Sequence, residues 1–137
     1  MMKKLLILSP KPLAALALFG LAQLAAGAAL AQGRAAQIFP FQTGEELYQN
    51  ICQGCHMPDA KGATGAGAYP ALAANKHLKA ALYPAGLVMS GRKAMPAFGE
   101  MLTDEQIAAV VNYVRSNFGN NYQDKLTPEM VHILRPR

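Results

Sequence analysis

The segment ICQGCHMPDAKG at residues 51–62 constrains this chain most, because it contains both cysteines of the 137-residue sequence. Cys52 and Cys55 are spaced i, i+3, and His56 follows the second cysteine directly. Four explanations are open for such a pair: a disulfide, part of a zinc site, a redox dithiol, or an attachment point for a larger group. The rest of the sequence helps to distinguish them.

The first 31 residues have the pattern of a secretory signal peptide. Three lysines accompany an Ala- and Leu-rich run over residues 13–30, and ALA at 29–31 is the small-residue pattern that signal peptidase requires. We predict cleavage after Ala31 and a periplasmic mature chain of about 106 residues. Retention as a membrane anchor is the alternative, because the run approaches the ~18–20 residues that a spanning helix needs.

Removal of this segment changes the charge of the chain. The full sequence has thirteen Lys and Arg against eight Asp and Glu, and loss of three lysines lowers the net charge from +5 to +2. The sequence has no basic run and no basic patch interleaved with aromatic residues. Charge therefore gives no support for a nucleic-acid partner, and we predict none.

Two capping boxes predict the main helices. TGEE at 43–46 begins a helix that carries Leu47, Tyr48 and Ile51 into the cysteine segment. TDEQ at 103–106 begins a longer helix, whose apolar stripe runs to residue 118 with Gly119 beyond its end. We therefore expect a helix at each end of a helical core.

The segments between and after these helices are shorter. We predict an irregular Gly- and Pro-containing stretch at 57–70, a short helix after Asn75 that Pro84 interrupts, a second short helical piece at 85–90 that Gly91 ends, and a loop at 92–102. Thr127 caps a last short helix that runs through Leu134. The chain has no alternating β-branched runs and no hairpin signals, so the fold class is all-α.

Three of the four explanations for the cysteine pair have weak support. A disulfide across so short a loop stabilises a protein little. A structural zinc site takes four ligands, but there is no second cysteine pair, and His77 and His132 lack metal-ligand spacing to this segment. A thioredoxin-like dithiol is expected in a βαβ context, which this sequence does not predict. The dithiol remains the principal alternative.

The fourth explanation is covalent haem, because C-x-x-C-H is the c-type haem attachment motif. Two thiols one helical turn apart match the two vinyl groups of a haem, and the next side chain can face the iron. The export signal, the capped helix before the motif and the Met-Pro loop after it support this explanation. We predict one haem c per chain, with Cys52 and Cys55 as anchors and His56 as the proximal ligand.

Haem iron with one axial histidine has either a second ligand or an open site, and a methionine ligand raises the potential relative to histidine. Met95 is the predicted sixth ligand, because it lies in a loop and Pro96 restricts both residues to extended conformations. Met89 falls in a predicted helix, where a flexible core filler is expected. The predicted mature chain has five methionines in total: Met57, Met89, Met95, Met101 and Met130.

Over roughly residues 44–118 the chain resembles the class I cytochromes c, small soluble electron carriers with His/Met-ligated haem. The resemblance rests on CQGCH, YPAL at 69–72, GRKAMPAFG at 91–99 and LTDEQIAAVVNYVRSNFG at 102–119. It implies the class I cytochrome c fold, with N- and C-terminal helices packed across a covalently bound haem.

The resemblance also implies roles for individual residues. Pro70 matches the proline whose carbonyl accepts a hydrogen bond from the proximal histidine, here His56, which fixes its tautomer. Leu72 matches a leucine that packs on the haem. Four further positions match the crossing of the first and last helices: Gly44, Tyr48, Val110 and Tyr113.

We divide the chain into a signal peptide (1–31), an extended lead-in (32–43), a cytochrome c domain (44–118) and a C-terminal extension with a short helix (119–137). Residues 112–136 are similar to the ends of cytochrome c domains that serve periplasmic dehydrogenases. The extension either docks a partner or covers the surroundings of the haem.

The resemblance implies an electron carrier or electron-transfer subunit rather than an enzyme. Its expected donor is a periplasmic dehydrogenase, and its expected acceptor is an oxidase or another cytochrome of the respiratory chain. Arg92 and Lys93 either steer an acidic partner or form a solvated loop pair. The alternative function is a haem enzyme or ligand sensor with an open distal site. Membrane contact is expected only if the signal segment is retained.

Overall fold

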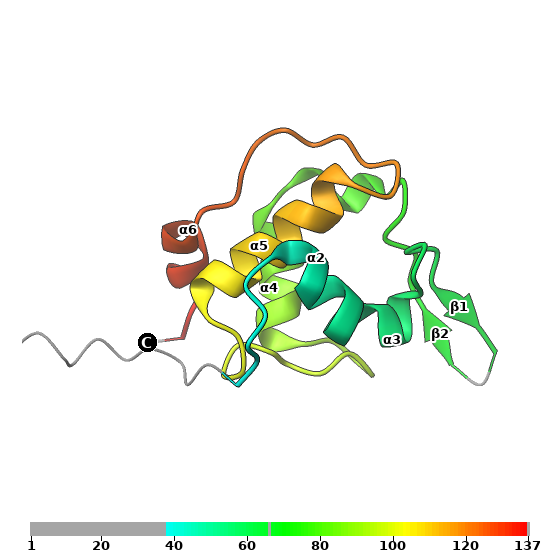
Figure 1. Cartoon of the computed structure of the whole chain (residues 1–137), viewed down its shortest axis with the longest axis horizontal. Coiled ribbons are helices and arrows are strands. Elements are labelled where there is room, and N and C mark those ends of the chain that lie inside the picture. Colours follow the sequence, from blue (N-terminus) through cyan, green and yellow to red (C-terminus); the bar gives the residue numbers. More distant parts are fainter. Residues whose placement is uncertain (1–37, 66, 137) are drawn as a thin grey trace, which may run out of the picture. The chain divides into compact units, whose positions relative to one another are not determined.

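The structure, a computed structural model, describes residues 38–65 and 67–136 (Figure 1). The predicted signal peptide and its cleavage site lie outside these residues. Within the described part, no helix is long and apolar enough to cross a membrane. Its elements, in chain order, are α2 Gly44–Leu47, η1 Tyr48–Cys52, α3 Gln53–His56, β1 Ala63–Thr64, β2 Ala68–Tyr69, η2 Lys76–Lys79, α4 Leu82–Ser90, α5 Asp104–Ser116 and α6 Pro128–His132.

The predicted helix after Thr43 is confirmed, and it runs through α2, η1 and α3 without a break. Its capping box is formed as expected. The Glu46 N–H donates to the Thr43 hydroxyl oxygen at 3.2 Å, and the Thr43 N–H donates to the Glu46 carboxylate at 3.1 Å. The middle turn, η1, is π-helical, which the sequence pattern did not indicate. Such wider turns often occur at functional sites, and this one ends at Cys52.

The first helix crosses α5 at Gly44 (Figure 1). A Cβ atom on Gly44 would lie 2.2 Å from the Ala109 carbonyl oxygen and 2.6 Å from the Tyr113 Cβ, so only glycine permits this approach. One turn later, the Tyr48 ring lies 5.9 Å from the Tyr113 ring and 4.8 Å from the Phe118 ring. The two helices therefore meet through a glycine contact and an aromatic cluster.

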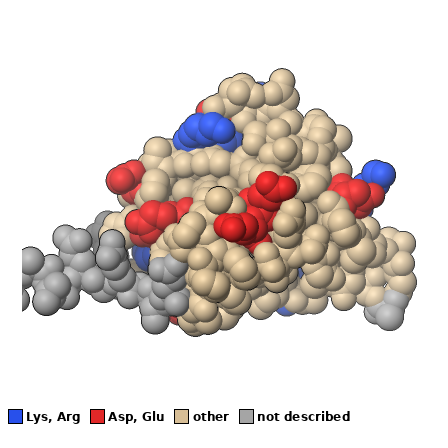
Figure 2. Space-filling view, viewed as in Figure 1, with Lys and Arg blue, Asp and Glu red and all other residues tan. Residues whose placement is uncertain are grey.

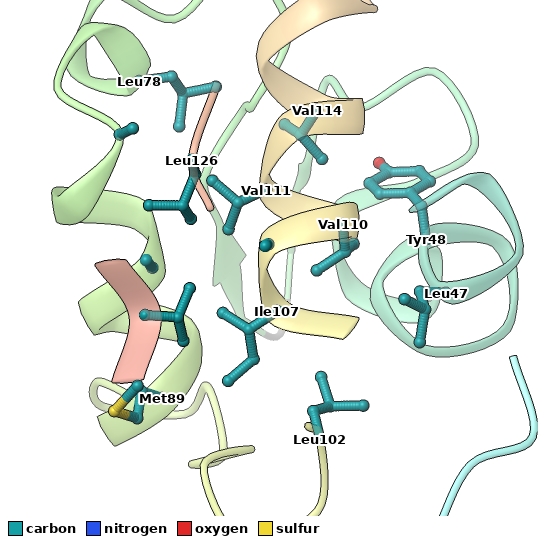
Figure 3. Packing of buried hydrophobic residues seen from close by; sticks show 14 of the residues in the cluster. Leu47, Tyr48, Leu78, Met89, Leu102, Ile107, Val110, Val111, Val114 and Leu126 are labelled. Carbon is teal, nitrogen blue, oxygen red and sulfur yellow. The ribbon is translucent and has the colours of Figure 1, made fainter. Parts of the chain in front are cut away.

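Buried apolar side chains surround α5 on both sides. In Figure 3, Leu47 and Tyr48 lie on one side of α5, and Leu78, Leu126 and Met89 lie on the other. These side chains bury apolar surface against the helix, which is the main favourable contribution to folding. The predicted stripe of α5 is buried at four positions: Ile107, Val110, Val111 and Val114.

The prediction that Pro84 interrupts a helix is wrong. Pro84 is the third residue of α4, in the first turn, where the backbone N–H of an ordinary residue would have no intrahelical acceptor. Proline therefore costs no hydrogen bond there. The helix predicted after Asn75 is only the 3₁₀ turn η2, although Asn75 caps it by accepting from the His77 N–H at 2.9 Å.

A small antiparallel hairpin, β1–β2, lies inside the stretch predicted to be irregular. Ala63 pairs with Tyr69 and Thr64 pairs with Ala68. The turn closes through a hydrogen bond from the Gly65 N–H to the Gly67 carbonyl at 3.0 Å. A hairpin of this kind depends on backbone pairing over only two residues per strand, so apolar alternation does not reveal it. The rest of the described elements are helical.

Helix α5 ends at Ser116, two residues earlier than predicted. Phe118 has a φ of +55°, which takes it out of the helix, and its ring packs against Tyr48. Gly119 follows with a φ of +78°. Two consecutive residues in the left-handed region reverse the chain and begin the C-terminal extension.

The C-terminal extension packs on the domain rather than projecting from it (Figure 1). Val131 of α6 is fully buried, and Leu126 is 2 % exposed. Arg115 of α5 is also fully buried, and it donates hydrogen bonds to three carbonyls: Leu78 at 2.9 Å, Lys79 at 3.0 Å and Asp124 at 2.5 Å. The extension therefore completes the core of the described unit.

Candidate functional site

The cysteine motif lies at the end of the first helix. Cys52 is the last residue of η1, and Cys55 and His56 are the last two residues of α3. No disulfide joins the two cysteines; Cys55 is exposed and Cys52 is partly buried. The helix thus presents two thiols one turn apart, followed at once by an imidazole.

The electrostatics of Cys52 are unlike those of a reactive dithiol. Burial, followed by the charge of Cys55, raises the pKa of the Cys52 thiol to about 12. Cysteines of disulfide oxidoreductases have lowered pKa values, because the thiolate is the nucleophile. A thiol that stays protonated at neutral pH is poorly suited to that chemistry, which weakens the dithiol alternative.

His56 is 9 % exposed, and its Nδ1 atom lies 3.0 Å from the Pro70 carbonyl oxygen. A carbonyl can only accept, so Nδ1 carries the proton and donates to it. In the neutral imidazole Nε2 is then the unprotonated nitrogen, and it forms no hydrogen bond with any residue that the structure describes. A metal-binding histidine is usually held in this way, with one ring nitrogen donating to a carbonyl and the other available to the metal.

Gly62 makes the approach of Pro70 to His56 possible. Its φ is +68°, and a Cβ atom there would lie 2.1 Å from the Tyr69 carbonyl oxygen and 2.8 Å from the Pro70 carbonyl carbon. The Gly62 N–H also donates to the His56 carbonyl at 3.1 Å. The sequence does not indicate this role of Gly62, because a glycine among several glycines carries no signal of its own.

Tyr48, which the resemblance placed only at the helix crossing, also fixes the chain directly after His56. The Tyr48 hydroxyl donates to the Met57 carbonyl at 2.7 Å, and Met57 has a φ of +67°. Burial raises the pKa of Tyr48 to about 12, with a smaller contribution from Cys52. The hydroxyl therefore remains a donor at neutral pH. Met57 itself turns away from the helix path, so the segment changes direction immediately after the motif.

Leu72 lies two residues beyond Pro70 and is partly buried against the core. Its N–H donates to the Ala60 carbonyl at 2.7 Å, and Ala60 is fully buried. The Asn120 side-chain amide donates to the Leu72 carbonyl at 2.8 Å. The loop with Pro70 and Leu72 is thus held both by the turn after the motif and by the C-terminal extension.

Met95 lies, as predicted, in the loop between α4 and α5, residues 92–103, which we call the Met95 loop. Arg92 and Met95 exchange backbone hydrogen bonds, each N–H donating to the other's carbonyl at 3.0 Å. Lys93, between them, has a φ of +55°. These contacts make a tight turn and fix the backbone of Met95, whose side chain is partly exposed.

Gly91, the C-cap of α4, lies directly against the backbone of the Met95 loop. A Cβ atom on Gly91 would lie 2.6 Å from the Met95 carbonyl oxygen, 2.7 Å from the Ala97 nitrogen and 2.8 Å from the Pro96 carbonyl carbon. Its φ and ψ of +68° and 173° belong to a region that only glycine readily adopts. The sequence indicates Gly91 only as the end of a helix, not as a contact of this loop.

Met89 occupies a different environment from Met95. It is 7 % exposed, lies in α4 and belongs to the apolar core in Figure 3. A Cβ atom on Gly99 would lie 2.9 Å from the Met89 Cγ, so the side chain is packed against backbone. Of these two methionines, Met95 is the one whose thioether the core does not enclose.

The residues present suit a haem. Within the described residues, no three His, Cys, Asp or Glu side chains converge as a metal-ion site would require. Haem c needs a different set: two thiols one turn apart, an imidazole with a free nitrogen, and apolar surface for the porphyrin. Partly buried apolar side chains come from η1, the Pro70 loop, α4 and the Met95 loop: Ile51, Leu72, Val88 and Phe98.

Comparison with known proteins agrees with this chemistry. The chain is 39% identical over 93 residues to the fructose dehydrogenase cytochrome subunit of Gluconobacter japonicus, an alignment that covers 56% of this chain and 19% of that protein. It is 30% identical over 109 residues to the gluconate 2-dehydrogenase cytochrome c subunit of Pantoea cypripedii, covering 69% of this chain and 24% of that protein. The aligned region is therefore about a fifth to a quarter of the length of these subunits.

A smaller relative is matched over most of its length. The chain is 34% identical over 86 residues to cytochrome c6 of Gracilaria tenuistipitata var. liui, covering 58% of this chain and 74% of that protein. Residues 40–114, more than half of the chain, match the family model described as cytochrome c oxidase, cbb3-type, subunit III. The chain therefore belongs to this family of c-type cytochromes, and it carries covalently bound haem c.

Proposed function

We propose that this protein accepts single electrons from a periplasmic dehydrogenase and passes them to an oxidase or another cytochrome of the respiratory chain. The observation that carries the proposal is the hydrogen bond from His56 Nδ1 to the Pro70 carbonyl, directly after the C-x-x-C-H motif. It leaves a buried, oriented imidazole with a free nitrogen, as an axial ligand of haem iron requires. The names of the dehydrogenase subunits support a dehydrogenase as donor.

We assign Cys52 and Cys55 to the two thioether links and His56 Nε2 to the proximal position. When bound, haem c supplies one-electron chemistry by cycling between its ferric and ferrous states. Pro70 holds the proton on Nδ1 and so keeps the ligating nitrogen free. Leu72, two residues on, offers apolar surface for one side of the porphyrin.

We assign Met95 to the distal position. Its backbone is fixed by Arg92 and by the contact with Gly91, while its side chain is not part of the core. A ligand held by a constrained loop moves little between oxidation states. This favours a carrier, in which both axial ligands remain bound, over the alternative of a haem enzyme or ligand sensor with an open distal site.

The charge distribution suggests how partners approach. Figure 2 shows acidic side chains gathered on the face that contains α2 and the beginning of α5, where Glu45, Glu46 and Glu105 occupy first turns.

Arg92 and Lys93 are exposed beside the Met95 turn. We propose that these two basic side chains meet an acidic patch of the donor or acceptor, which makes the rate of electron transfer fall with ionic strength.

The experiment uses the full chain produced in a periplasm that attaches haem. The ferric protein is mixed rapidly with a substrate-reduced sugar dehydrogenase, and the appearance of the ferrous spectrum is followed. Wild-type protein is expected to be reduced in a second-order reaction. Cys55→Ala is a control for covalent attachment, since it removes one link and leaves His56 in place.

Met95→Ala separates the proposal from its alternative. A carrier should lose its methionine-ligated spectrum and its potential should fall, because methionine raises the potential. An unchanged spectrum and potential would contradict the assignment of Met95. Rapid binding of cyanide or reaction with peroxide by the wild-type protein would instead favour the open-site enzyme or sensor.

A further inference from the structure

Arg135, in the C-terminal extension, reaches across to the end of the Met95 loop. Its Nη1 donates to the Gly99 carbonyl at 2.5 Å, and its Nη2 donates to the Leu102 carbonyl at 3.0 Å. Its Nε donates to the Asp104 carboxylate at 2.6 Å. The guanidinium thus binds two carbonyls of the loop and the first residue of α5 at once.

The segment around Gly99, whose carbonyl Arg135 binds, also forms hydrogen bonds with α4. The Gly99 N–H donates to the Met89 carbonyl at 3.0 Å, and the Phe98 N–H donates to the Val88 carbonyl at 2.9 Å. Gly99 and Leu102 are both buried. The end of the loop therefore lies between α4 and the guanidinium, four residues after Met95.

We propose that Arg135 is a positioning residue for Met95, an inference that rests on the proposed role of Met95 as distal ligand. The loop is fixed before Met95 by Arg92 and after it by Gly99, so Met95 has little freedom between two anchors. Loss of the guanidinium leaves the carbonyls of Gly99 and Leu102, which are both buried residues, without this donor. Buried unpaired carbonyls are costly, and the loop moves outward to regain water.

The extension has other attachments, so loss of Arg135 does not release it. Val131 is fully buried, and Thr127 caps α6 by accepting from the Met130 N–H at 3.4 Å. After loss of Arg135, Asp104 still has His132 as a partner, because the His132 Nδ1 lies 3.1 Å from the Asp104 carboxylate. His132→Gln is therefore a matched control: it removes another partner of the same carboxylate from the same C-terminal extension, but it leaves the loop carbonyls bound.

The test measures imidazole binding to the ferric full-length haem protein, because imidazole must displace Met95 to bind. We expect Arg135→Gln to bind imidazole about tenfold more tightly than wild type, equivalent to about 1.4 kcal/mol. His132→Gln should bind it with wild-type affinity. Arg135→Lys, which keeps the charge but cannot span both carbonyls, should fall between wild type and Arg135→Gln. Far-UV circular dichroism confirms that each variant is folded.

A double-variant cycle makes the test specific to Met95. In a Met95→Ala background the distal position is already vacated, so adding Arg135→Gln should leave imidazole affinity unchanged. A similar tenfold change in that background would overturn the proposal, because Arg135 would then act on the fold in general. If Met95→Ala tightens binding but Arg135→Gln and Arg135→Lys do not, this inference fails alone. If Met95→Ala does not tighten binding, the distal assignment fails with it.

Discussion

Gly91→Ala is the substitution with the most direct predicted effect on the site. The added Cβ would lie 2.6–2.8 Å from backbone atoms of Met95, Pro96 and Ala97, and backbone cannot move aside as a flexible side chain can. Alanine must also adopt a φ of +68° with a ψ of 173°, which costs about 1–3 kcal/mol. With the steric displacement, we expect a total loss of about 2–4 kcal/mol in the free energy of unfolding.

The assay is thermal unfolding of the haem protein, followed by circular dichroism and by the methionine-ligated absorption of the ferric form. For a domain of this size, the expected loss corresponds to a fall in Tm of roughly 10–25 °C. The methionine-ligated absorption should weaken well below the new Tm, since the displaced segment carries Met95. The two signals should therefore separate in this variant.

Gly65→Ala is the matched control, because a Cβ atom there would have no neighbour within 4 Å and its φ is not in the left-handed region. It should change the unfolding free energy by less than about 0.5 kcal/mol. If Gly91→Ala unfolds like wild type and keeps full methionine ligation, the close contact between Gly91 and the Met95 loop is refuted.

Three further predictions concern stability. Tyr48→Phe should lower the unfolding free energy by about 1–2 kcal/mol through loss of a buried hydrogen bond, and an unchanged denaturant midpoint would contradict this. The double substitution of Cys52 and Cys55 by alanine should give a largely unfolded apoprotein, so a cooperative thermal transition would count against it. Arg115 lowers the pKa of Asp124, so this carboxylate stabilises the fold above its ordinary pKa near 4 and loses that effect as pH falls through the lowered value. Asp124→Asn should flatten the acid side of the stability profile, and an unaltered profile would refute the coupling.

Local sequence rules predicted the parts of the fold that depend on nearby residues. The capping boxes at Thr43 and Thr103 both form, and both begin the helices they indicated. The loop position of Met95 and the cap at Thr127 were also predicted correctly. Each of these features depends on residues within four positions of one another, where spacing and residue type carry the information.

Features that depend on distant contacts were missed or misplaced. Pro84 was expected to break a helix, because a pattern alone does not show that α4 begins only two residues earlier. Phe118 fits the apolar spacing of α5, but aromatic packing on Tyr48 takes it out of the helix. The buried guanidinium of Arg115 was not predicted, since its acceptors come from other segments.

In the candidate site, too, residues set by local spacing were predicted from it, and residues set by contacts between distant segments were not. The motif identified Cys52, Cys55 and His56 from spacing alone, whereas Pro70 and Leu72 came only from a family resemblance. The structure places the Pro70 carbonyl within hydrogen-bond distance of His56, fourteen residues earlier. Gly62 and Gly91 had no signal, because the need for glycine appears only when a second backbone segment is seen to approach.

The proposed carrier function depends on Met95 as the distal ligand, and one NMR measurement tests this assignment most directly. The ferrous full-length protein is labelled with ¹³C at the methionine methyl groups, and its spectrum is compared with that of Met95→Leu. We expect one methyl resonance shifted far upfield by the porphyrin ring current, and its loss in Met95→Leu. If the shifted resonance persists in that variant, or if no methionine methyl is shifted, Met95 is not the distal ligand.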